Sequence, residues 1–501
     1  MTIDLITRAH DHVGNTAIAD QHGTYSYRRL LQDSARVAAR LLGGRPDLEE
    51  ARVAFLARPS FEYVAMQWGI WRAGGIAVPL AVMHPVREWE YVLDDTAPAA
   101  LIVDREFTEK IEPLAKARSL PLHGCQDLGA SEPGELPGLD GDRRAMILYT
   151  SGTTSRPKGV VTTHANNQAQ VSTLISAWGW DEADRILNVL PLHHVHGIIN
   201  LLSCALGAGA CCEFLTPFDG RRVWQRIAAE DLTLFMAVPT IYSKLIAAWE
   251  VATPEEQRSW TAGAAALRLM VSGSAALPVS TLERWHEITG HVLLERYGMT
   301  EIGMALSNPL DGDRRGGHVG LPLPSIDVRR VDDSGRVVEG ETPGEIEVRG
   351  PTVFLEYWNR PAETRDAFRE GWFRTGDVAL VHEGAFRILG RSSVDIIKTG
   401  GYKVSALEIE EVLRTHPQVN ECAVVGIPDK EWGERVAACV VLAGEEPLRL
   451  EELSFWAKER LAPYKIPRQL SVTAALPRNA MGKVQKPAVV KLFASPPPAD
   501  S

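Results

Sequence analysis

The segment that decides the fold runs Tyr149-Thr150-Ser151-Gly152-Thr153-Thr154-Ser155-Arg156-Pro157-Lys158-Gly159 and follows a short apolar run, Ala145 to Leu148. Hydroxyl groups, glycines and a lysine in one loop suit a bound polyphosphate, because glycine lets backbone N–H groups approach the phosphates and lysine supplies positive charge. The G-x-x-x-x-G-K-[ST] order of a Walker A loop is absent. The segment therefore predicts a phosphate loop of another kind, placed between a strand and a helix. An ordinary flexible turn is the alternative.

Strand and helix patterns alternate on both sides of this loop. Residues 25–45 have apolar positions at helical spacing, and residues 61–74 predict a second helix between two short apolar strands at 52–57 and 76–80. This rhythm predicts an α/β fold with layered, largely parallel sheets.

The pattern changes after about residue 320, where short β segments such as 344–350 and 385–390 indicate a β-rich subdomain. A compact α+β pattern begins near residue 392, with predicted helices at 406–414 and 450–461 and strands at 421–426 and 435–442. We therefore predict a large N-terminal domain over 1–391 and a small C-terminal domain over 392–501.

Composition limits the class of protein. The 501-residue chain carries a net charge of −11, which argues against a broad nucleic-acid-binding surface. Six cysteines are scattered without zinc-like spacing, and no apolar run approaches membrane-spanning length. The first residues, MTIDLITRAHDHVG, lack the apolar core of a secretory signal. These features predict a cytoplasmic protein that does not enter membranes.

Four further motifs add chemistry. Glu295-Arg296-Tyr297-Gly298-Met299-Thr300-Glu301 places an acid beside a hydroxyl on a glycine turn, which suits magnesium held between protein and phosphates. In Thr375-Gly376-Asp377 the carboxylate can bind ribose hydroxyls. Gly390-Arg391 precedes the run 395–403, and Pro477-Arg478-Asn479-Ala480-Met481-Gly482-Lys483 ends in a lysine beside glycine. Each motif alone is also found in ordinary turns or helix caps.

Together and in this order, the five motifs resemble those of the acyl-adenylate-forming superfamily, which includes acyl-CoA synthetases, firefly luciferase and the adenylation domains of peptide synthetases. The resemblance covers essentially the whole chain. It implies a large N-terminal domain, a small mobile C-terminal domain, and a reaction in which ATP activates a carboxylic acid as its acyl-adenylate. It also implies magnesium as cofactor and coenzyme A as co-substrate.

The resemblance assigns a role to each matching residue. The phosphate loop comprises Thr150, Ser151, Gly152, Thr153, Thr154 and Lys158. Thr300 and Glu301 contact the α-phosphate and magnesium, with Thr154 as a second magnesium contact. The adenosine site comprises Ser274, Ala275, Ala276, Tyr297, Asp377 and Arg391. Lys483 is the lysine of the adenylation step, and Gly400 and Gly401 lie at the coenzyme A tunnel. Ser393 and Val394 both remain candidates for the hinge.

Residues around the expected acyl pocket indicate which acid is activated. His194 matches the family histidine that gates the carboxylate, while His196 and Met304 are further candidate pocket residues. The three histidines 193, 194 and 196 could instead bind a metal, although no further ligand pattern accompanies them. Arg296 offers a planar fork of donors for a second carboxylate, and Lys244 could add another cation. The alternatives are an ion pair between Arg296 and Glu295 and a surface role for Lys244.

Longer segments resemble malonyl-CoA synthetases of the mammalian mitochondrial type, among them 189–197, 235–245 and 288–309. The resemblance implies ligation of malonate, and to some extent methylmalonate, to coenzyme A by a monomer or homodimer. The alternatives are a synthetase for another short, medium-chain or aromatic acid, an adenylation domain that loads a carrier protein, and a relative that binds nucleotide without catalysis.

Overall fold

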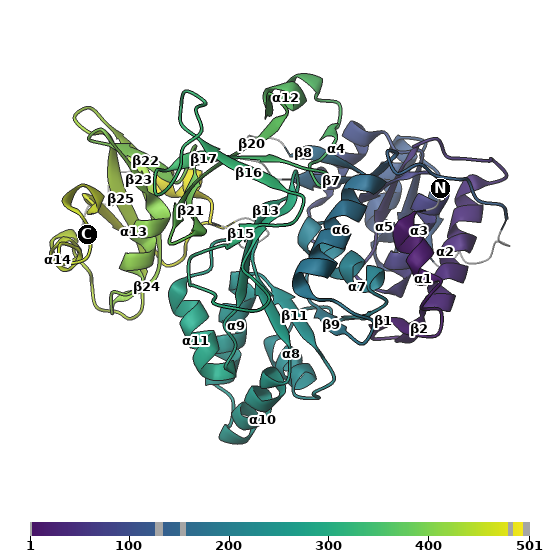
Figure 1. Ribbon diagram of the computed structural model, residues 1–501, viewed down its shortest axis with the longest axis horizontal. Coiled ribbons are helices and arrows are strands. Elements are labelled where there is room, and N and C mark those ends of the chain that lie inside the picture. The colour runs from purple at the N-terminus through teal and green to yellow at the C-terminus, as the bar shows by residue number, and fades with distance from the viewer. Residues whose placement is uncertain (1–2, 126–133, 151–156, 479–483, 494–501) are drawn as a thin grey trace.

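The computed structural model describes residues 3–125, 134–150, 157–478 and 484–493 (Figure 1). Two large sheets form most of the N-terminal region. The first has nine strands in the order β15 (Leu321–Pro322), β14 (Gly303–Ser307), β13 (Leu294–Met299), β12 (Leu269–Ser272), β11 (Leu234–Ala237), β9 (Arg185–Asn188), β10 (Cys211–Phe214), β1 (Thr16–Asp20) and β2 (Gly23–Ser26). Its strands from β13 to β1 run parallel, and those at its two edges pair antiparallel.

The second sheet has seven strands in the order β18 (Glu356–Tyr357), β8 (Lys158–Thr163), β7 (Arg144–Thr150), β4 (Ile76–Pro79), β3 (Arg52–Leu56), β5 (Ala100–Val103) and β6 (Leu122–Gly124). The stretch from β7 to β6 is parallel. The mixed, largely parallel α/β architecture predicted from the sequence is thereby confirmed.

Helices cover both sheets. Those of the first part are α1 (Asp4–Ala9), α2 (Tyr27–Leu42), α3 (Phe61–Arg72), α4 (Val86–Thr96), α5 (Thr108–Ala117), α6 (His164–Trp178), the π-helix His196–Ser203 and α7 (Cys204–Gly207). A second group comprises α8 (Gly220–Ile227), α9 (Pro239–Glu250), α10 (Pro254–Ala265) and α11 (Val279–Thr289), which gather near β11 (Figure 1). Among the described residues, no helix is both long and apolar enough to cross a bilayer.

Local sequence explains why α2 forms where the periodicity predicts it. The Ser26 hydroxyl accepts a hydrogen bond from the Arg29 amide, which caps the first turn. Gly43 ends the helix with a φ of 53°, a left-handed conformation that glycine adopts without strain. The helix packs closely on α3, because a Cβ at Gly69 would lie 2.3 Å from Val37 Cγ1.

The predicted strand–loop–helix unit at 145–170 is wrong in one respect. The segment after the loop is the strand β8, which pairs antiparallel with β7, and α6 begins only at His164. Val160, Val161 and two threonines favour a strand there. A capping box between Thr163 and Asn166 then starts the helix. The phosphate loop therefore joins two strands, and no helix N-terminus follows it directly.

The rest of the chain is richer in β structure. A third sheet contains β16 (Asp327–Val331), β17 (Gly344–Arg349), β19 (Phe368–Arg369), β20 (Trp372–His382) and β21 (Ala385–Arg391), with α12 (Pro361–Asp366) beside it. A fourth contains β22 (Ile396–Thr399), β23 (Tyr402–Ser405), β24 (Val419–Asp429), β25 (Gly433–Leu442) and β26 (Gln469–Val472), with α13 (Ala406–Leu413), α14 (Leu450–Ala457) and α15 (Lys486–Leu492). The domain boundary at residue 391 stays a prediction.

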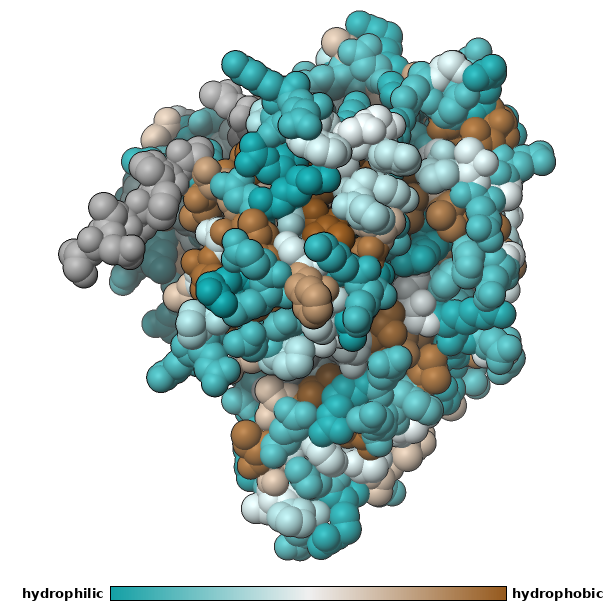
Figure 2. Space-filling view, turned by 90° about the vertical axis from the view of Figure 1, so that its left-hand side faces the viewer, coloured by the Kyte–Doolittle hydropathy of each residue, from teal (hydrophilic) through white to brown (hydrophobic). Residues whose placement is uncertain are grey.

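The fourth sheet and its helices form the end of the molecule at the left of Figure 1, which Figure 2 views face on. Hydrophilic side chains cover much of this face, with small apolar areas between them. The apolar core of this unit is separate from that of the large sheets and includes Val404, Ile409 and Leu453.

Candidate active site

The residues predicted to bind the nucleoside come together from three strands. The Tyr297 hydroxyl donates to Asp377 Oδ2 at 2.6 Å, and Arg391 Nε lies 3.1 Å from Asp377 Oδ1. Asp377 on β20 stands opposite Arg391 on β21 in the antiparallel register, which explains the contact. Burial raises the pKa of Asp377, although the Arg391 guanidinium acts in the opposite direction. A buried carboxylate, whose oxygens can each accept more than one hydrogen bond, suits hydroxyl donors such as those of ribose.

Glu301 lies close to this group. Its carboxyl is buried, accepts a hydrogen bond from the Tyr357 hydroxyl at 3.0 Å, and has its pKa raised by burial. Thr300 precedes it in the turn between β13 and β14 and is partly exposed. A carboxylate desolvated in this way fits a magnesium ligand, because a bound cation would offset the cost of burying its charge.

The described ends of the phosphate loop face the same region. Thr150 pairs with Lys158 across β7 and β8. Lys158 Nζ lies 2.6 Å from Glu363 Oε2 and 4.9 Å from the centre of the Tyr357 ring. Of the predicted site, Ser151, Gly152, Thr153, Thr154 and Lys483 lie outside the described residues.

Arg296 is the most deeply buried cation of the predicted site, with 3% of the residue exposed. It extends from β13 over Gly273, where a Cβ would lie 2.5 Å from Arg296 Cζ. A side chain at this position would therefore require the guanidinium to shift. Its Nη2 reaches the Ser274 hydroxyl at 3.5 Å, and that hydroxyl lies 3.2 Å from His196 Nδ1.

No carboxylate among the described residues forms an ion pair with Arg296, and its Nε has no hydrogen-bond partner among them. The adjacent Glu295 does not supply the charge, since successive strand residues point to opposite faces and its carboxyl accepts from the Gly317 amide at 3.1 Å. Burial lowers the pKa of Arg296 to about 9 and raises that of Glu295 to about 8. The pocket therefore holds a desolvated cation that lacks an anion.

His196 belongs to this pocket, while the other histidines stand at its edge. Burial lowers the pKa of His196 well below its usual value, with Arg296 adding to the shift. Burial also lowers the pKa of His193 well below its usual value, with His194 and His84 adding to the shift, and the ring centres of His193 and His194 lie 4.1 Å apart. No cluster of metal-binding side chains forms among the described residues. Neutral imidazoles beside a guanidinium leave the pocket with one dominant charge.

Several other predicted residues differ in how far they are exposed. Lys244 is exposed on α9, where its ammonium lies 5.7 Å from the centre of the Phe218 ring. Met304 is buried in β14 against Gly298. Ser274 has a φ of 70°, a strained conformation for serine, and the exposed Ala275 and Ala276 follow it.

Gly400 and Gly401 form the turn between β22 and β23. Their φ values are 56° and 84°, which explains two successive glycines in a tight hairpin. Gly400 packs on the Trp432 ring, whereas a Cβ at Gly401 would meet open space. Gly401 is therefore accessible to a ligand.

Sequence reasoning did not identify three residues of this site. Tyr357 contacts Glu301, Glu363 pairs with Lys158, and Gly273 makes room for Arg296. The first two lie some 200 residues from Lys158 in the chain, in a stretch without a charged motif. Gly273 could have been found, because a glycine next to a polar pocket residue signals close approach.

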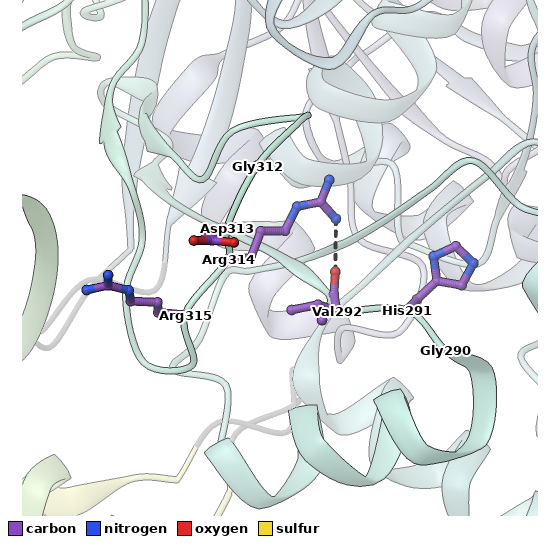
Figure 3. A pocket seen from close by; sticks show the side chains of 7 residues that line it. All are labelled: Gly290, His291, Val292, Gly312, Asp313, Arg314 and Arg315. Carbon is purple, nitrogen blue, oxygen red and sulfur yellow. Dashed lines mark hydrogen bonds between the residues drawn. The ribbon is translucent and has the colours of Figure 1, made fainter.

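An open hollow lies elsewhere, beside the N-terminal end of β13. Figure 3 shows Arg314 and Arg315 at its rim, with Arg314 donating to the Val292 carbonyl at 2.9 Å. Arg314 donates to further backbone carbonyls, and Arg315 pairs with Glu383. Both cations therefore already have structural partners, and the hollow contains none of the predicted site residues.

Comparison with known proteins agrees with this arrangement of motifs. Residues 5–358 match the AMP-binding enzyme family, and residues 408–483 match the AMP-binding enzyme C-terminal domain. The chain belongs to the AMP-binding enzymes. The resemblance to acyl-adenylate-forming enzymes that the sequence showed is thereby confirmed. The ligase members of this family join an acid to coenzyme A.

Malonate–CoA ligases are among the proteins that this chain resembles. The mitochondrial enzyme of Xenopus laevis is 47% identical over 97% of this chain and 91% of its own, and that of Homo sapiens is 45% identical over 98% and 92%. The crystal structure of ATP-bound MatB from Rhodopseudomonas palustris superposes with a TM-score of 0.90 at 33% identity and covers 98% of this chain and 99% of its own. The resemblance to malonyl-CoA synthetases is confirmed.

The prediction of a cytoplasmic location is wrong. The malonate–CoA ligases of Xenopus laevis, Mus musculus, Homo sapiens and Bos taurus are mitochondrial proteins by name. The prediction rested on composition and on the first residues of the sequence. Scattered cysteines and an acidic net charge carry no signal that separates these two compartments.

Proposed function

We propose that this enzyme ligates malonate to coenzyme A through malonyl-adenylate. The observation that carries the choice of acid is the buried Arg296, which has no carboxylate partner among the described residues. An unpaired buried charge is costly, so a protein retains one where a ligand supplies its partner. Malonate has a second carboxylate one methylene from the first, and this group can pair with the buried guanidinium. The malonate–CoA ligase relatives support the same acid.

The reaction has two steps. In the first, a malonate carboxylate attacks the α-phosphorus of ATP, and the bond to pyrophosphate breaks. In the second, the coenzyme A sulfur attacks the acyl carbon, loses its proton, and AMP leaves. The first step joins two anions, so cations must offset their repulsion. We propose that three cations offset the repulsion. Lys158 does so at the β- and γ-phosphates, Arg296 at the distal carboxylate and Lys483 at the reacting centre.

Magnesium and the nucleoside are proposed to occupy the group around Glu301 and Asp377. ATP-bound MatB, and a MenE structure in complex with ATP and magnesium ion, support both ligands. Glu301 would hold magnesium, which supplies charge neutralisation for the pyrophosphate that leaves. Asp377 and Arg391 would hold the ribose hydroxyls. The oligomeric state, a monomer or a homodimer, stays a prediction.

A panel of acids tests the proposal. Purified enzyme, MgATP and coenzyme A are incubated with malonate, methylmalonate, succinate, butyrate, hexanoate or benzoate, and thioesters are identified by mass. Malonyl-CoA, AMP and pyrophosphate are expected, with methylmalonate as the next best acid because it carries the same two carboxylates. Preference for hexanoate or benzoate would overturn the choice of acid. Release of ADP and phosphate would overturn the mechanism.

A further inference from the structure

The segment that carries Lys483 has a stem that the structure describes on both sides. Arg478 and Val484 form an antiparallel bridge, and the Gln485 amide donates to the Pro477 carbonyl at 2.8 Å. The stem leads directly into α15, whose first residue is Lys486.

Lys486 is anchored by two buried carboxylates. Its Nζ lies 2.6 Å from Asp395 Oδ1 and 2.8 Å from Glu410 Oε1. All three side chains are largely buried, with 11%, 14% and 5% of their surfaces exposed respectively. Burial works to lower the pKa of Lys486, but the two carboxylates outweigh it and raise the pKa overall. The ammonium is therefore fixed as a charged, desolvated centre.

The two carboxylates connect Lys486 to different parts of the C-terminal unit. Glu410 on α13 also accepts from the Val424 amide on β24 at 2.8 Å, so its side chain is held by the main sheet. Asp395 follows the candidate hinge residues, and its Oδ2 accepts from the Arg391 amide at 3.0 Å. Lys486 thus joins the stem to both the sheet and the start of the unit.

The link continues into the nucleotide site. The Arg391 backbone is tied to Asp395, and the Arg391 side chain pairs with Asp377 at 3.1 Å. Gly390 allows this geometry, because its φ is 121° and a Cβ there would lie 2.4 Å from Asp395 Cβ. Two ion pairs, joined by a hydrogen bond from the Arg391 backbone amide, therefore connect α15 to the carboxylate proposed to bind ribose.

We infer that Lys486 is a positioning residue for adenylation, because it fixes the described stem on either side of the Lys483 segment relative to Asp395. It does not contact substrate itself. The proposal rests on the proposed function of Lys483. Thioester formation does not use Lys483, so it does not depend on this contact. A misplacement of about 1 Å in a reacting group lowers the rate roughly 100-fold, and loss of Lys486 is expected to act on that scale.

The test measures the two half-reactions separately. For Lys486→Met, pyrophosphate release with malonate and MgATP is expected to fall roughly 100-fold. Formation of malonyl-CoA from supplied malonyl-AMP should stay within about threefold of the wild type. Lys486→Arg keeps the charge and should recover most of the adenylation rate. Lys491→Met, on the exposed side of the same helix, is the matched control and should leave both half-reactions unchanged.

Asp395→Asn covers the case in which Lys486→Met does not fold. It removes one charge, leaves Lys486 paired with Glu410, and should produce the same selective loss of adenylation. If both variants retain adenylation, or if Asp395→Asn lowers both half-reactions equally, the positioning role is overturned. Failure of the wild-type enzyme to adenylate malonate would instead overturn the proposed function, and the ratio of half-reactions would then be measured with whichever acid the panel identifies.

Discussion

Replacing Arg296 by methionine should convert a preference for malonate into indifference between malonate and butyrate. The substitution keeps most of the side-chain volume and removes the charge. Malonate then has to bring its distal carboxylate into a buried pocket without a partner, whereas butyrate never uses that contact.

The structure sets the size of the effect. Arg296 is almost fully buried, so the ion pair with malonate is poorly screened by solvent. Two unit charges about 4 Å apart attract by about 4 kcal/mol at an effective dielectric constant of about 20. Truncating one partner of a buried charge pair typically costs about 2–5 kcal/mol. This corresponds to a loss of roughly 30- to 5,000-fold in kcat/KM for malonate.

The assay compares kcat/KM for the adenylation of malonate with that for butyrate. Both rates are measured from the release of pyrophosphate. Glu295→Gln is the matched control, because Glu295 is adjacent to Arg296 in β13 but points to the opposite face. This variant should keep the wild-type preference between the two acids. Arg296→Lys should recover only part of the malonate rate, since lysine lacks the planar fork.

Thermal unfolding separates a functional from a structural role for Arg296. A buried cation without a protein partner destabilises the unliganded fold, so Arg296→Met should keep or raise Tm. Equal losses of malonate and butyrate turnover, together with a lower Tm, would refute the reasoning.

Four other outcomes are expected. Because the pKa of Arg296 is lowered to about 9, its guanidinium is charged in the free enzyme below that pH. The value of kcat/KM for malonate, but not that for butyrate, should therefore fall as the pH rises through about 9. The pKa of Glu295 is raised to about 8, so the folded state holds a proton that the unfolded state releases from about pH 4.5. Stability should therefore fall between about pH 4.5 and 8, and Glu295→Gln should flatten that fall in urea titrations. Lys158→Met should lower kcat/KM for ATP at least about 100-fold. Glu363→Gln should change it less than about fivefold, because the Lys158–Glu363 pair is partly exposed and weak. Gly401→Leu should block thioester formation from malonyl-AMP yet spare adenylation, and a loss of both would contradict separate roles for the two C-terminal loops.

Local pattern determined much of the fold in advance. The helix at α2 follows from apolar spacing between a serine cap and a glycine stop, and the apolar run before Thr150 became β7 as predicted. The segment after the phosphate loop was misjudged, because a short β-branched run can end a loop as a strand or enter a helix, and only pairing with β7 selects between them.

The sequence by itself determined the reaction class, because five motifs in fixed order name the groups that bind ATP and an acid. It also singled out Arg296. What it left open was whether that arginine has a partner, since Glu295 is its neighbour in the chain. Only the tertiary structure decided this, because strand alternation turns Glu295 away and Gly273, from another strand end, makes room for a buried guanidinium. The Lys486 contacts were equally hidden, since charge pairing across 91 residues depends on how α15 packs against the start of the C-terminal unit.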